Sequence, residues 1–497
     1  MPATSPARLA VGTGTGILAI ALLLMCVPGH PAAGRHGGAA QSEYPVRPPG
    51  HHMTGLTGGV EGGYAPALPV VPAVGLLYNT TSVEGIPAWT ARGARYVEGS
   101  NVLQLPSGRW KYLPRGRTVS VVVAAGDPAA RRQIAESRAW LAAGKVPGDT
   151  PERRACAERA LLSMRALLQP NGALAAAWTP GWKYSWPRDA SFTSAAFAHT
   201  GHHAEAFRIL RYSAATQRPD GTWEARTKLD GSGPPDGRRW QLDANGWVPW
   251  ATWQWYQAAP AVTRRPGLAV LYPMIRKAAD YAASSLGADG LPPASPDYWE
   301  LATTTPNIGT AAPLLAGLNS AADLAVAAGH PGDAARWRSA AKRLSSGISK
   351  NFAPLGYRRT ADGRHGHDSA ATFMAPPFTT ARPGLARALD ATYKALLMPN
   401  GGLTPGNAPT APWGRNAWTP STSLFALAWA TTGERSKAER ILDWLISKKN
   451  PLGELHEKVD GTGSPSSVAP LAWTGSITLL SLVALGGQGL PTPPSGT

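Results

Sequence analysis

The segment from Trp182 to Asp189 contains residue types that suit the binding of a sugar. Its sequence, Trp-Lys-Tyr-Ser-Trp-Pro-Arg-Asp, places three aromatic rings and an adjacent arginine and aspartate within eight residues. Aromatic rings can stack on the apolar C–H faces of a sugar, and an arginine and a carboxylate can bind neighbouring hydroxyls through charge-assisted hydrogen bonds. The alternative is a packed loop in which Asp189 is the N-cap of the Ala-rich helix that follows. This segment alone leaves both interpretations open.

Two later segments contain acidic residues that could form a catalytic pair. Glycosidases use two carboxylates that act on the scissile bond of a sugar. The run Asp297-Tyr-Trp-Glu300 places one glutamate beside a tryptophan and near a second acid, an environment that suits a proton donor. The run from Gly453 to Asp460 contains Glu457 among other charged residues. Taken singly, the first could be a helix-flanking surface contact and the second a charged loop.

Order and context of the motifs point to one family. The motifs are Tyr184-Ser-Trp-Pro-Arg-Asp189, Trp240-Gln-Leu-Asp-Ala-Asn-Gly246, Asp297-Tyr-Trp-Glu300, Trp418, Glu457 and Pro470-Leu-Ala-Trp473. In this order they resemble glycoside hydrolase family 15, the glucoamylase-like family, over residues 127–485. The resemblance implies an (α/α)6 catalytic domain that hydrolyses α-glucosidic bonds from the non-reducing end with inversion.

The resemblance also implies roles for individual residues. Glu300 matches the general acid that protonates the leaving oxygen, and Glu457 matches the general base that activates water. Arg188 and Asp189 match residues that hold the outer hydroxyls of the terminal glucose. The other residues on matching substrate-binding positions are Tyr184, Trp186, Trp240, Asp243, Trp299, Arg415 and Trp418. No metal ligand and no cofactor is expected.

The chain also departs from the family pattern. Leu301 stands where the family often has a second acid, which puts contacts beyond the cleaved bond in question. Trp182 stands where the family commonly has a tyrosine near the catalytic water, and an indole can donate a hydrogen bond but not accept one. Neither a large N-terminal β-sandwich nor a C-terminal starch-binding domain is recognisable, so a short soluble α-glucan is a more suitable substrate than raw starch.

The pattern of apolar residues indicates a mainly α protein. From Asp127 onward, Ala- and Leu-rich runs with three- and four-residue spacing alternate with long polar gaps such as 217–243 and 399–419. Helices are expected to begin near Pro128, Pro151, Ala190, Ala204, Asn245, Pro266, Pro306, Pro331, Ser369, Pro383, Pro420, Gly433 and Ala469. Paired helices with long loops favour an (α/α)6 toroid; the alternative of a helical solenoid lacks a fixed sequence period.

The remaining parts of the chain differ in composition from this helical region. We predict a secretory signal peptide over residues 1–40, with cleavage near 33 or 40, because a single Arg8 precedes the apolar run from Ile17 to Val27. A Pro- and Gly-rich arm over 41–93 and a small β-region over 94–126 follow, ahead of the toroid at 127–487. A disordered tail is expected at 488–497.

Charge and cysteine content exclude several classes of protein. The net charge is +17, but basic residues are scattered and no nucleic-acid motif occurs, so we expect a solvated surface and no nucleic-acid partner. After removal of the signal, Cys156 is the remaining cysteine, so the mature chain has no internal disulfide. No transmembrane span is expected in the mature chain, which is predicted to be a monomer.

The sequence thus predicts a secreted inverting exo-α-glucosidase that acts on α-glucans or α-linked oligosaccharides and releases β-D-glucose. Association with the cell envelope is also compatible with the basic surface. Two alternatives stay open: an (α/α)6 glycoside phosphorylase, which would use phosphate in place of a base, and a sugar-binding or adhesion protein on a decayed glycosidase scaffold. The sequence leaves the linkage, α-1,4, α-1,6 or α,α-1,1, undecided.

Overall fold

The helices of the chain form two rings, one inside the other. The computed structural model describes residues 72–408 and 412–495. Six inner elements pack one against the next in a closed cycle. In order around the ring they are α4 (Pro187–His199), α6 (Ala244–Ala258), α8 (Ile308–Ala327), the 3₁₀ helix η2 (Ser369–Met374), α11 (Thr419–Thr431) and α13 (Ala472–Val483). The cycle closes because α13 packs against α4.

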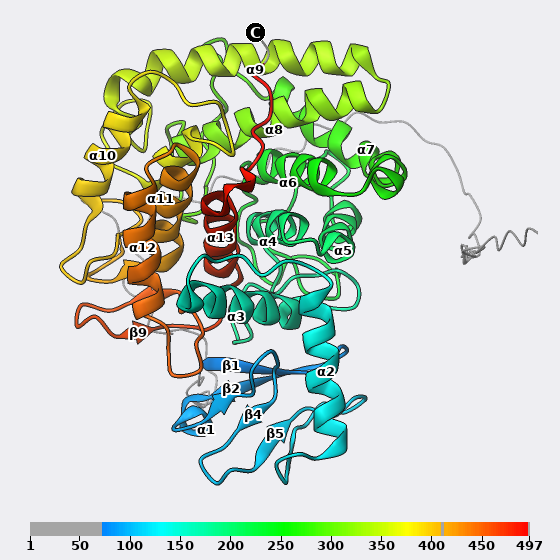
Figure 1. Ribbon diagram of the computed structural model, residues 1–497. Helices are drawn as coiled ribbons and strands as arrows, with labels where there is room; N and C mark the ends of the chain where they lie inside the picture. Colours follow the sequence, from blue (N-terminus) through cyan, green and yellow to red (C-terminus); the bar gives the residue numbers. More distant parts are fainter. Residues whose placement is uncertain (1–71, 409–411, 496–497) are drawn as a thin grey trace, which may run out of the picture. The chain divides into compact units, whose positions relative to one another are not determined.

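Each inner element has an outer helix packed against it. In the same order the outer helices are α5 (His203–Ala215), α7 (Ala261–Ser284), α9 (Pro331–Asn351), α10 (Leu385–Leu396), α12 (Arg435–Ser447) and α3 (Pro151–Leu167). The sixth pair joins the first helix of the toroid to the last, and Figure 1 shows α3 and α13 side by side. The predicted (α/α)6 toroid is confirmed, and the solenoid alternative is wrong.

The inner helices are buried on nearly every side, which explains their composition. Every described residue of α8 from Ile308 to Ala322 is buried. Small residues allow the backbones to approach closely: a Cβ atom added at Gly317 would lie 2.5 Å from the Cα of Gly246 in α6. Alanine at either position would therefore force the two helices apart.

Helix boundaries follow local capping signals. The Thr150 hydroxyl accepts a hydrogen bond from the backbone of Arg153 at 3.2 Å, ahead of Pro151 at the first helical position. Asn307 caps α8 in the same way, which moves its start from the expected Pro306 to Ile308. The structure starts α4 at Pro187 rather than Ala190, so Asp189 lies in the first helical turn and is not the N-cap.

Two expected helix starts differ for other reasons. Helix α7 begins at Ala261, with Pro260 as its N-cap residue, and continues through Pro266, the expected start. The Pro260 carbonyl accepts the first helical hydrogen bond, from the backbone of Arg264 at 3.0 Å. The element expected to begin at Ser369 does begin there, but it is a six-residue 3₁₀ helix rather than an α-helix. The fourth inner element of the toroid is consequently short.

Strands β1 to β6 precede the toroid and lie together at one end of it (Figure 1). A four-stranded antiparallel sheet has the order β3-β4-β5-β6, in the sequence order of a meander. Its strands are β3 (Arg95–Tyr96), β4 (Leu103–Gln104), β5 (Trp110–Tyr112) and β6 (Val121–Val123), followed by α2 (Pro128–Ala142). These strands lie inside the region 94–126 in which the sequence predicts short extended runs.

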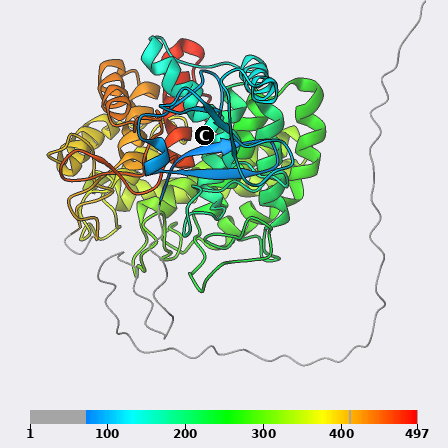
Figure 2. The same cartoon turned by 90° about the horizontal axis from the view of Figure 1, so that it is seen from below.

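The Pro- and Gly-rich arm predicted over 41–93 has regular secondary structure at its C-terminal end. Residues 73–91 form a hairpin of β1 (Ala73–Tyr78) and β2 (Val83–Pro87), followed by the short helix α1 (Ala88–Ala91). The hairpin is ordered because Leu76 and Leu77 are fully buried and its backbone bonds to the toroid, as Ala73 does to Thr179 at 3.1 Å. Figure 2 shows β1 and β2 in front of the helices in the view from below.

The C-terminal segment also differs from the prediction of a disordered tail over 488–497. Beyond the short helix η3 (Ala484–Gln488), the described part extends to residue 495. The Gln254 side chain of α6 donates a hydrogen bond to the carbonyl of Pro491 at 3.0 Å, and Pro493 is buried. Proline rings and an inner-ring glutamine therefore attach this segment to the toroid.

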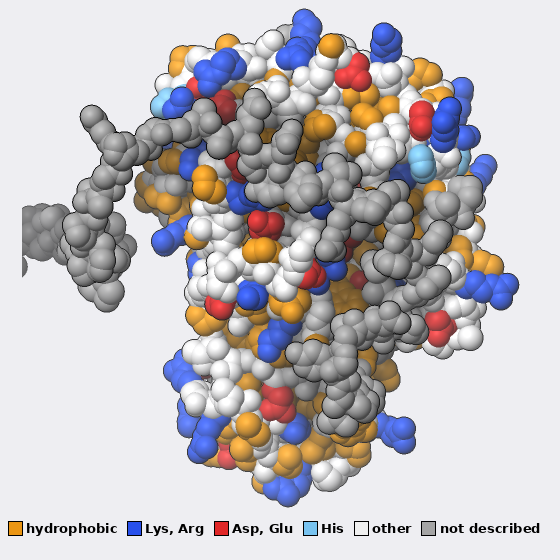
Figure 3. Space-filling model, turned by 180° about the vertical axis from the view of Figure 1, so that it is seen from behind, with side chains coloured by type: hydrophobic (Ala, Val, Ile, Leu, Met, Phe, Trp, Pro, Cys, Tyr) orange, Lys and Arg blue, Asp and Glu red, His pale blue; other side chains and the backbone are white. Residues whose placement is uncertain are grey.

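The predicted signal peptide and its cleavage points lie outside the described residues. Within the described ranges, every helix is too short or too polar to cross a membrane. On the face seen in Figure 3, Lys and Arg side chains are spread among polar and apolar ones rather than gathered into one patch. This distribution agrees with the scattered basic residues of the sequence.

Candidate active site

Glu300 lies in the loop between α7 and α8 and receives hydrogen bonds from two other parts of the chain. Its Oε1 atom accepts from the indole nitrogen of Trp186 at 2.6 Å, and its Oε2 atom accepts from the guanidinium of Arg238. The side chain is 25% exposed. Its backbone has a φ of +57°, a left-handed conformation that costs a non-glycine residue free energy. The loop is therefore held in a shape that directs this carboxylate toward Trp186.

A buried ionic network holds the loop that carries Glu300, through Asp297 three residues before it. Arg359 binds both carboxylate oxygens of Asp297, at 2.9 and 3.0 Å, and one oxygen of Asp368 at 2.6 Å. Tyr298 also donates to Asp368, and burial raises the pKa of this phenol so that it stays protonated as a donor. The two aspartates and Arg359 are almost completely buried, which fixes the loop in place.

Glu457 lies in the segment between α12 and α13, and three neighbouring side chains hold its carboxylate. Its Oε1 atom accepts from the indole nitrogen of Trp182 at 3.1 Å, and its Oε2 atom accepts from the Ser467 hydroxyl at 2.5 Å. The ammonium of Lys458 is 3.6 Å from the same oxygen. Backbone hydrogen bonds with Thr419 and Val468 fix the segment between α11 and α13. Trp182 thus takes a donor role toward the candidate base.

A small three-stranded sheet places the Glu457 segment next to Trp418. Its strands, in the order β7-β8-β9, are β7 (Ala417–Trp418), β8 (Lys458–Val459) and β9 (Pro465–Ser466). Trp418 pairs with Lys458 across the first two strands, and the Lys458 ammonium lies 4.1 Å from the centroid of its ring. The register therefore puts the residue after Glu457 against a predicted cleft tryptophan.

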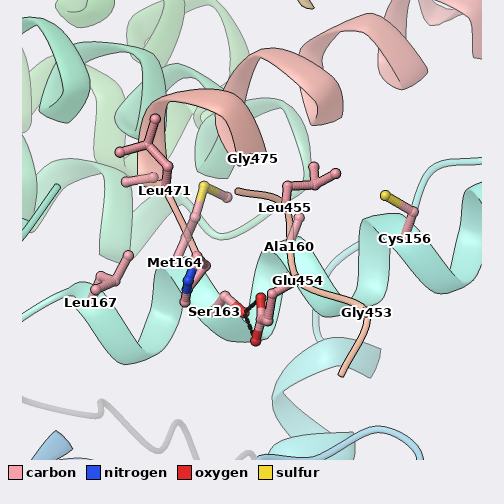
Figure 4. A pocket seen from close by; sticks show the side chains of 12 residues that line it. Cys156, Ala160, Ser163, Met164, Leu167, Gly453, Glu454, Leu455, Leu471 and Gly475 are labelled. Atoms are coloured by element: carbon pink, nitrogen blue, oxygen red, sulfur yellow. Dashed lines mark hydrogen bonds between the residues drawn. The ribbon is translucent and has the colours of Figure 1, made fainter. Parts of the chain in front are cut away.

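Glu454, three residues before Glu457, points to a different place. Its carboxylate accepts from the Ser163 hydroxyl of α3 at 2.7 and 2.9 Å (Figure 4). It also lies 3.3 Å from the Arg159 guanidinium. It lines a cavity of about 10 Å³ between α3 and the start of α13, room for about one water molecule. Free Cys156 lines the same cavity, and burial raises its pKa to about 11. Glu454 is therefore a structural carboxylate.

Arg188 and Asp189 lie in the first turn of α4, and both are buried. Arg188 donates to Gln241 at 3.1 Å and to Asp243 at 2.8 Å, which makes Asp243 the counter-ion of the arginine. Its guanidinium carbon lies 5.1 Å from the centre of the Trp473 ring. Because both hydrogen bonds come from one nitrogen, the rest of the guanidinium remains available for another partner.

Asp189 connects the two halves of the candidate site electrostatically. Burial raises the pKa of its carboxyl to about 7, opposed by Arg188 and reinforced by the negative charges of Glu300 and Glu457. Asp189 is therefore near enough to both glutamates for their negative charges to raise the pKa of its carboxyl. The hydrogen bonding found for it within the described ranges involves its backbone alone. Its side chain is thus a buried acceptor suited to a ligand hydroxyl.

A cluster of aromatic rings lies next to Glu300. The rings of Trp299 and Trp413 meet edge to face with centroids 4.9 Å apart, and Trp413 meets Trp418 in the same way at 5.2 Å. Leu301 packs against this cluster, so the position where the family often has an acid is apolar here. The Arg226 guanidinium lies over the rings of both Tyr184 and Trp186. Its carbon is 4.8 Å from the centroid of the first ring and 5.0 Å from that of the second.

Two residues proposed from the sequence lie apart from these contacts. Trp240 packs edge-on against Tyr281 of the outer helix α7, with centroids 6.0 Å apart. Arg415 is exposed, and within the described residues it forms no hydrogen bond or ion pair with either glutamate. Their predicted roles in binding have no support from these contacts.

Several residues of the site were missed by the sequence analysis. Arg226 and Arg238 come from the long 217–243 loop, whose length was a signal but whose individual residues were not distinguishable. Arg359 and Asp368 become recognisable only through their buried contact with Asp297. Ser467 and Trp413 lie in loops without a distinctive local pattern. Among residues 72–408 and 412–495, no cluster of three or more His, Cys, Asp or Glu side chains has the arrangement of a metal site.

Comparison with known proteins establishes the fold. No family model and no curated protein matches the chain. A wild-type glycosidase structure matches 67% of this chain and 97% of its own, with a TM-score of 0.58 and 20% identity. A bacterial glucoamylase complexed with acarbose matches 73% of this chain and 60% of its own, with a TM-score of 0.57 and 16% identity.

A glucoamylase from Saccharomycopsis fibuligera matches 69% of this chain and 97% of its own, with a TM-score of 0.53 and 14% identity. The chain therefore shares the (α/α)6 fold of glucoamylases. The resemblance predicted from the motifs is confirmed at the level of this fold.

Proposed function

We propose that the protein is a glycoside hydrolase that removes glucose from the non-reducing end of α-glucosides with inversion of configuration. The observation that carries this proposal is the arrangement of three carboxylates. Glu300 and Glu457 are held by separate loops, each through an indole N–H, and both act electrostatically on the buried Asp189. An inverting glycosidase needs an acid, a base and a site that binds the sugar between them.

In the proposed reaction, Glu300 in its protonated form donates its proton to the glycosidic oxygen as the bond from that oxygen to C1 breaks. Glu457 accepts a proton from water, and the resulting hydroxyl group forms the new bond to C1 from the opposite face. The Ser467 hydroxyl and the Trp182 indole orient the Glu457 carboxylate. Proton donation and proton removal by positioned carboxylates each accelerate the reaction by roughly 10²–10⁴-fold.

The terminal glucose would be held by the first turn of α4. The Asp189 carboxylate and the free side of the Arg188 guanidinium offer an acceptor and donors to neighbouring hydroxyls. The partly exposed Trp418 can contact the C–H groups of the sugar, and the buried ring of Trp413 packs between it and Trp299. Structural neighbours include a glycosidase in complex with glucose and a glucoamylase complexed with acarbose. We infer a short soluble α-linked oligosaccharide as the substrate.

Export of the protein is part of the proposal and depends on the N-terminal segment. The apolar run from Ile17 to Val27 supports cleavage near residue 33 or 40. Edman sequencing of the protein recovered from the culture medium tests this directly. A new N-terminus in the interval 33–41 is expected, and retention of Met1 in a cell-bound protein would contradict it.

The decisive experiment is proton NMR of the purified protein with maltose, isomaltose, trehalose and a maltodextrin. Early β-glucose from one of them is expected, and it would identify hydrolysis, inversion and linkage together. Early α-glucose would contradict the acid–base pair. Glucose 1-phosphate formed only in the presence of phosphate would favour a phosphorylase, and glycan binding without turnover would favour an adhesion protein.

A further inference from the structure

The contact between Arg238 and Glu300 places a cation beside the proposed general acid. An arginine has only hydrogen-bond donors, so it holds the carboxylate oxygen as an acceptor. The other oxygen is already an acceptor for Trp186. Each oxygen keeps a second acceptor site, so a protonated Glu300 can form beside Arg238, but the guanidinium and the glycosidic oxygen then meet at the same carboxyl group.

Among Arg226, Arg238, Asp236 and Glu300, the positive and negative charges are equal in number while Glu300 is ionised. Arg226 and Arg238 both contact Asp236, and Arg238 also contacts Glu300. Two guanidinium groups therefore face two carboxylates. When Glu300 takes up the proton that acid catalysis requires, one positive charge is left without a counter-ion. This charge belongs to Arg238, whose side chain is 32% exposed and can reach a ligand.

Arg238 lies next to the carboxylate that would protonate the leaving group, so its charge can act on a substrate bound there. The carboxylate of a general acid contacts the glycosidic oxygen, so Arg238, which is bonded to that carboxylate, lies within reach of the sugars that this oxygen joins. An anion attached to the leaving sugar could accept the hydrogen bonds of Arg238 in place of Glu300. The exchange would release the Glu300 oxygen and restore the charge balance with Glu300 protonated.

We propose that this enzyme prefers substrates whose leaving sugar carries a carboxylate or phosphate, and that Arg238 selects them by moving from Glu300 to the anion. The inference rests on the proposed glucosidase function and specifies its substrate class. Arg226 remains with Asp236 and stacked on Tyr184 and Trp186, so it positions the loop while Arg238 makes the exchange.

The test compares substrates that differ in one group. Maltitol and maltobionate share the same glucose and open-chain leaving group, but maltobionate ends in a carboxylate where maltitol has a hydroxymethyl group. Isomaltitol and isomaltobionate form the corresponding α-1,6 pair, and maltose 1-phosphate compared with maltose tests phosphate. We expect kcat/KM for the anionic substrate to be roughly tenfold or more above kcat/KM for its neutral partner. A hydrogen bond to a charged group contributes enough binding free energy for a ratio of this size.

Substitutions in the same loop assign the preference to one side chain. In Arg238→Gln the ratio should fall to about one, whereas Arg238→Lys should retain part of it because the charge remains. Arg239→Gln removes the same charge from the neighbouring exposed residue and should leave the ratio unchanged. A ratio near one in the wild-type enzyme, or one that survives Arg238→Gln, would overturn the proposal.

Binding measurements separate this proposal from the proposed function. Dissociation constants of maltitol and maltobionate, measured by calorimetry, report the charge preference even without bond cleavage. Tighter binding of maltobionate that is lost in Arg238→Gln would support the anion site although hydrolysis had failed. Equal dissociation constants, with or without turnover, would exclude it.

Discussion

The guanidinium of Arg359 lies directly over the ring of Trp299, with its carbon 3.6 Å from the ring centroid. Arg359 comes from the segment that follows α9, whereas Trp299 immediately precedes Glu300. The same guanidinium is shared between Asp297 and Asp368. One cation is therefore the shared counter-ion of two buried acids, and it fixes the tryptophan next to the candidate catalytic acid.

Replacement of Arg359 by methionine should destabilise the protein strongly. The change leaves two buried carboxylates without a counter-ion, and breaking a buried ion pair in this way costs about 3–5 kcal/mol. Chemical denaturation should show that loss in the free energy of unfolding. Arg359→Lys should recover part of the stability, because it keeps the charge but not the two-pronged contact with Asp297. Wild-type stability of the methionine variant would contradict this account of the network.

Replacement of Glu300 by glutamine should lower kcat by about 10²–10⁴-fold, the usual contribution of a general acid. The amide keeps the size of the side chain and can still accept from Trp186, so KM should change little. Steady-state kinetics on the substrate identified by NMR measures both quantities. Turnover close to that of the wild-type enzyme would contradict the assignment of Glu300 as the acid.

Glu454 and Glu457 provide a matched pair of substitutions in one loop. Glu457→Gln should abolish most turnover while the folded state is retained, since it removes the proposed base. Glu454→Gln should retain turnover and lower the free energy of unfolding by about 1–3 kcal/mol, because it weakens buried bonds to Ser163 and Arg159. Activity and thermal unfolding of both variants, measured together, distinguish the two roles. Equal loss of activity in both would contradict them.

The buried carboxyl of Asp189 should make stability depend on pH. Its pKa is raised to about 7 in the folded state from 3.8, so between these values the folded protein binds more protons than the unfolded chain. Stability contributed by the protonated form is present at low pH and is lost as pH rises toward 7. Asp189→Asn removes this loss.

The stability of Asp189→Asn relative to wild type should therefore increase from pH 4 to pH 7 and stay constant above it. Urea titrations at several pH values measure the difference. A difference that does not vary with pH would show that Asp189 is ionised throughout this range. The same variant should also lose productive glucose binding, which calorimetry with substrate can test separately.

The sequence was sufficient for the fold because local signals were consistent. Proline at the first helical position, after a capping residue such as Thr150, marked the start of the helix at Pro151. The Ala-rich composition of the inner helices matches their burial on nearly every side. The sequence could not predict the order of the tail at 489–495, since its anchor is the side chain of Gln254, far away in the chain. The hairpin at 73–87 was missed for a similar reason, as its short strands depend on contacts with the toroid.

The site was only partly predictable. The motif around Asp189 and the two glutamates could be located because aromatic and acidic residues lie adjacent in sequence. The partners of these residues could not, because they are distant in sequence: Arg238 is 62 residues from Glu300, and Trp182 is 275 residues from Glu457. Pairings over such distances follow from the tertiary fold rather than from spacing.

The pairing of α13 with α3 and α4 has a consequence for synthesis of the chain. The ring closes only through its last inner helix, and Glu457 lies in the loop just before that helix. A growing chain that has not yet reached Ala472 has an open ring whose Ala- and Leu-rich edge faces water. Contacts between such distant segments form late and slow folding. Nascent chains should therefore depend on protection of that edge until translation of α13 is complete, and activity should appear only after ring closure.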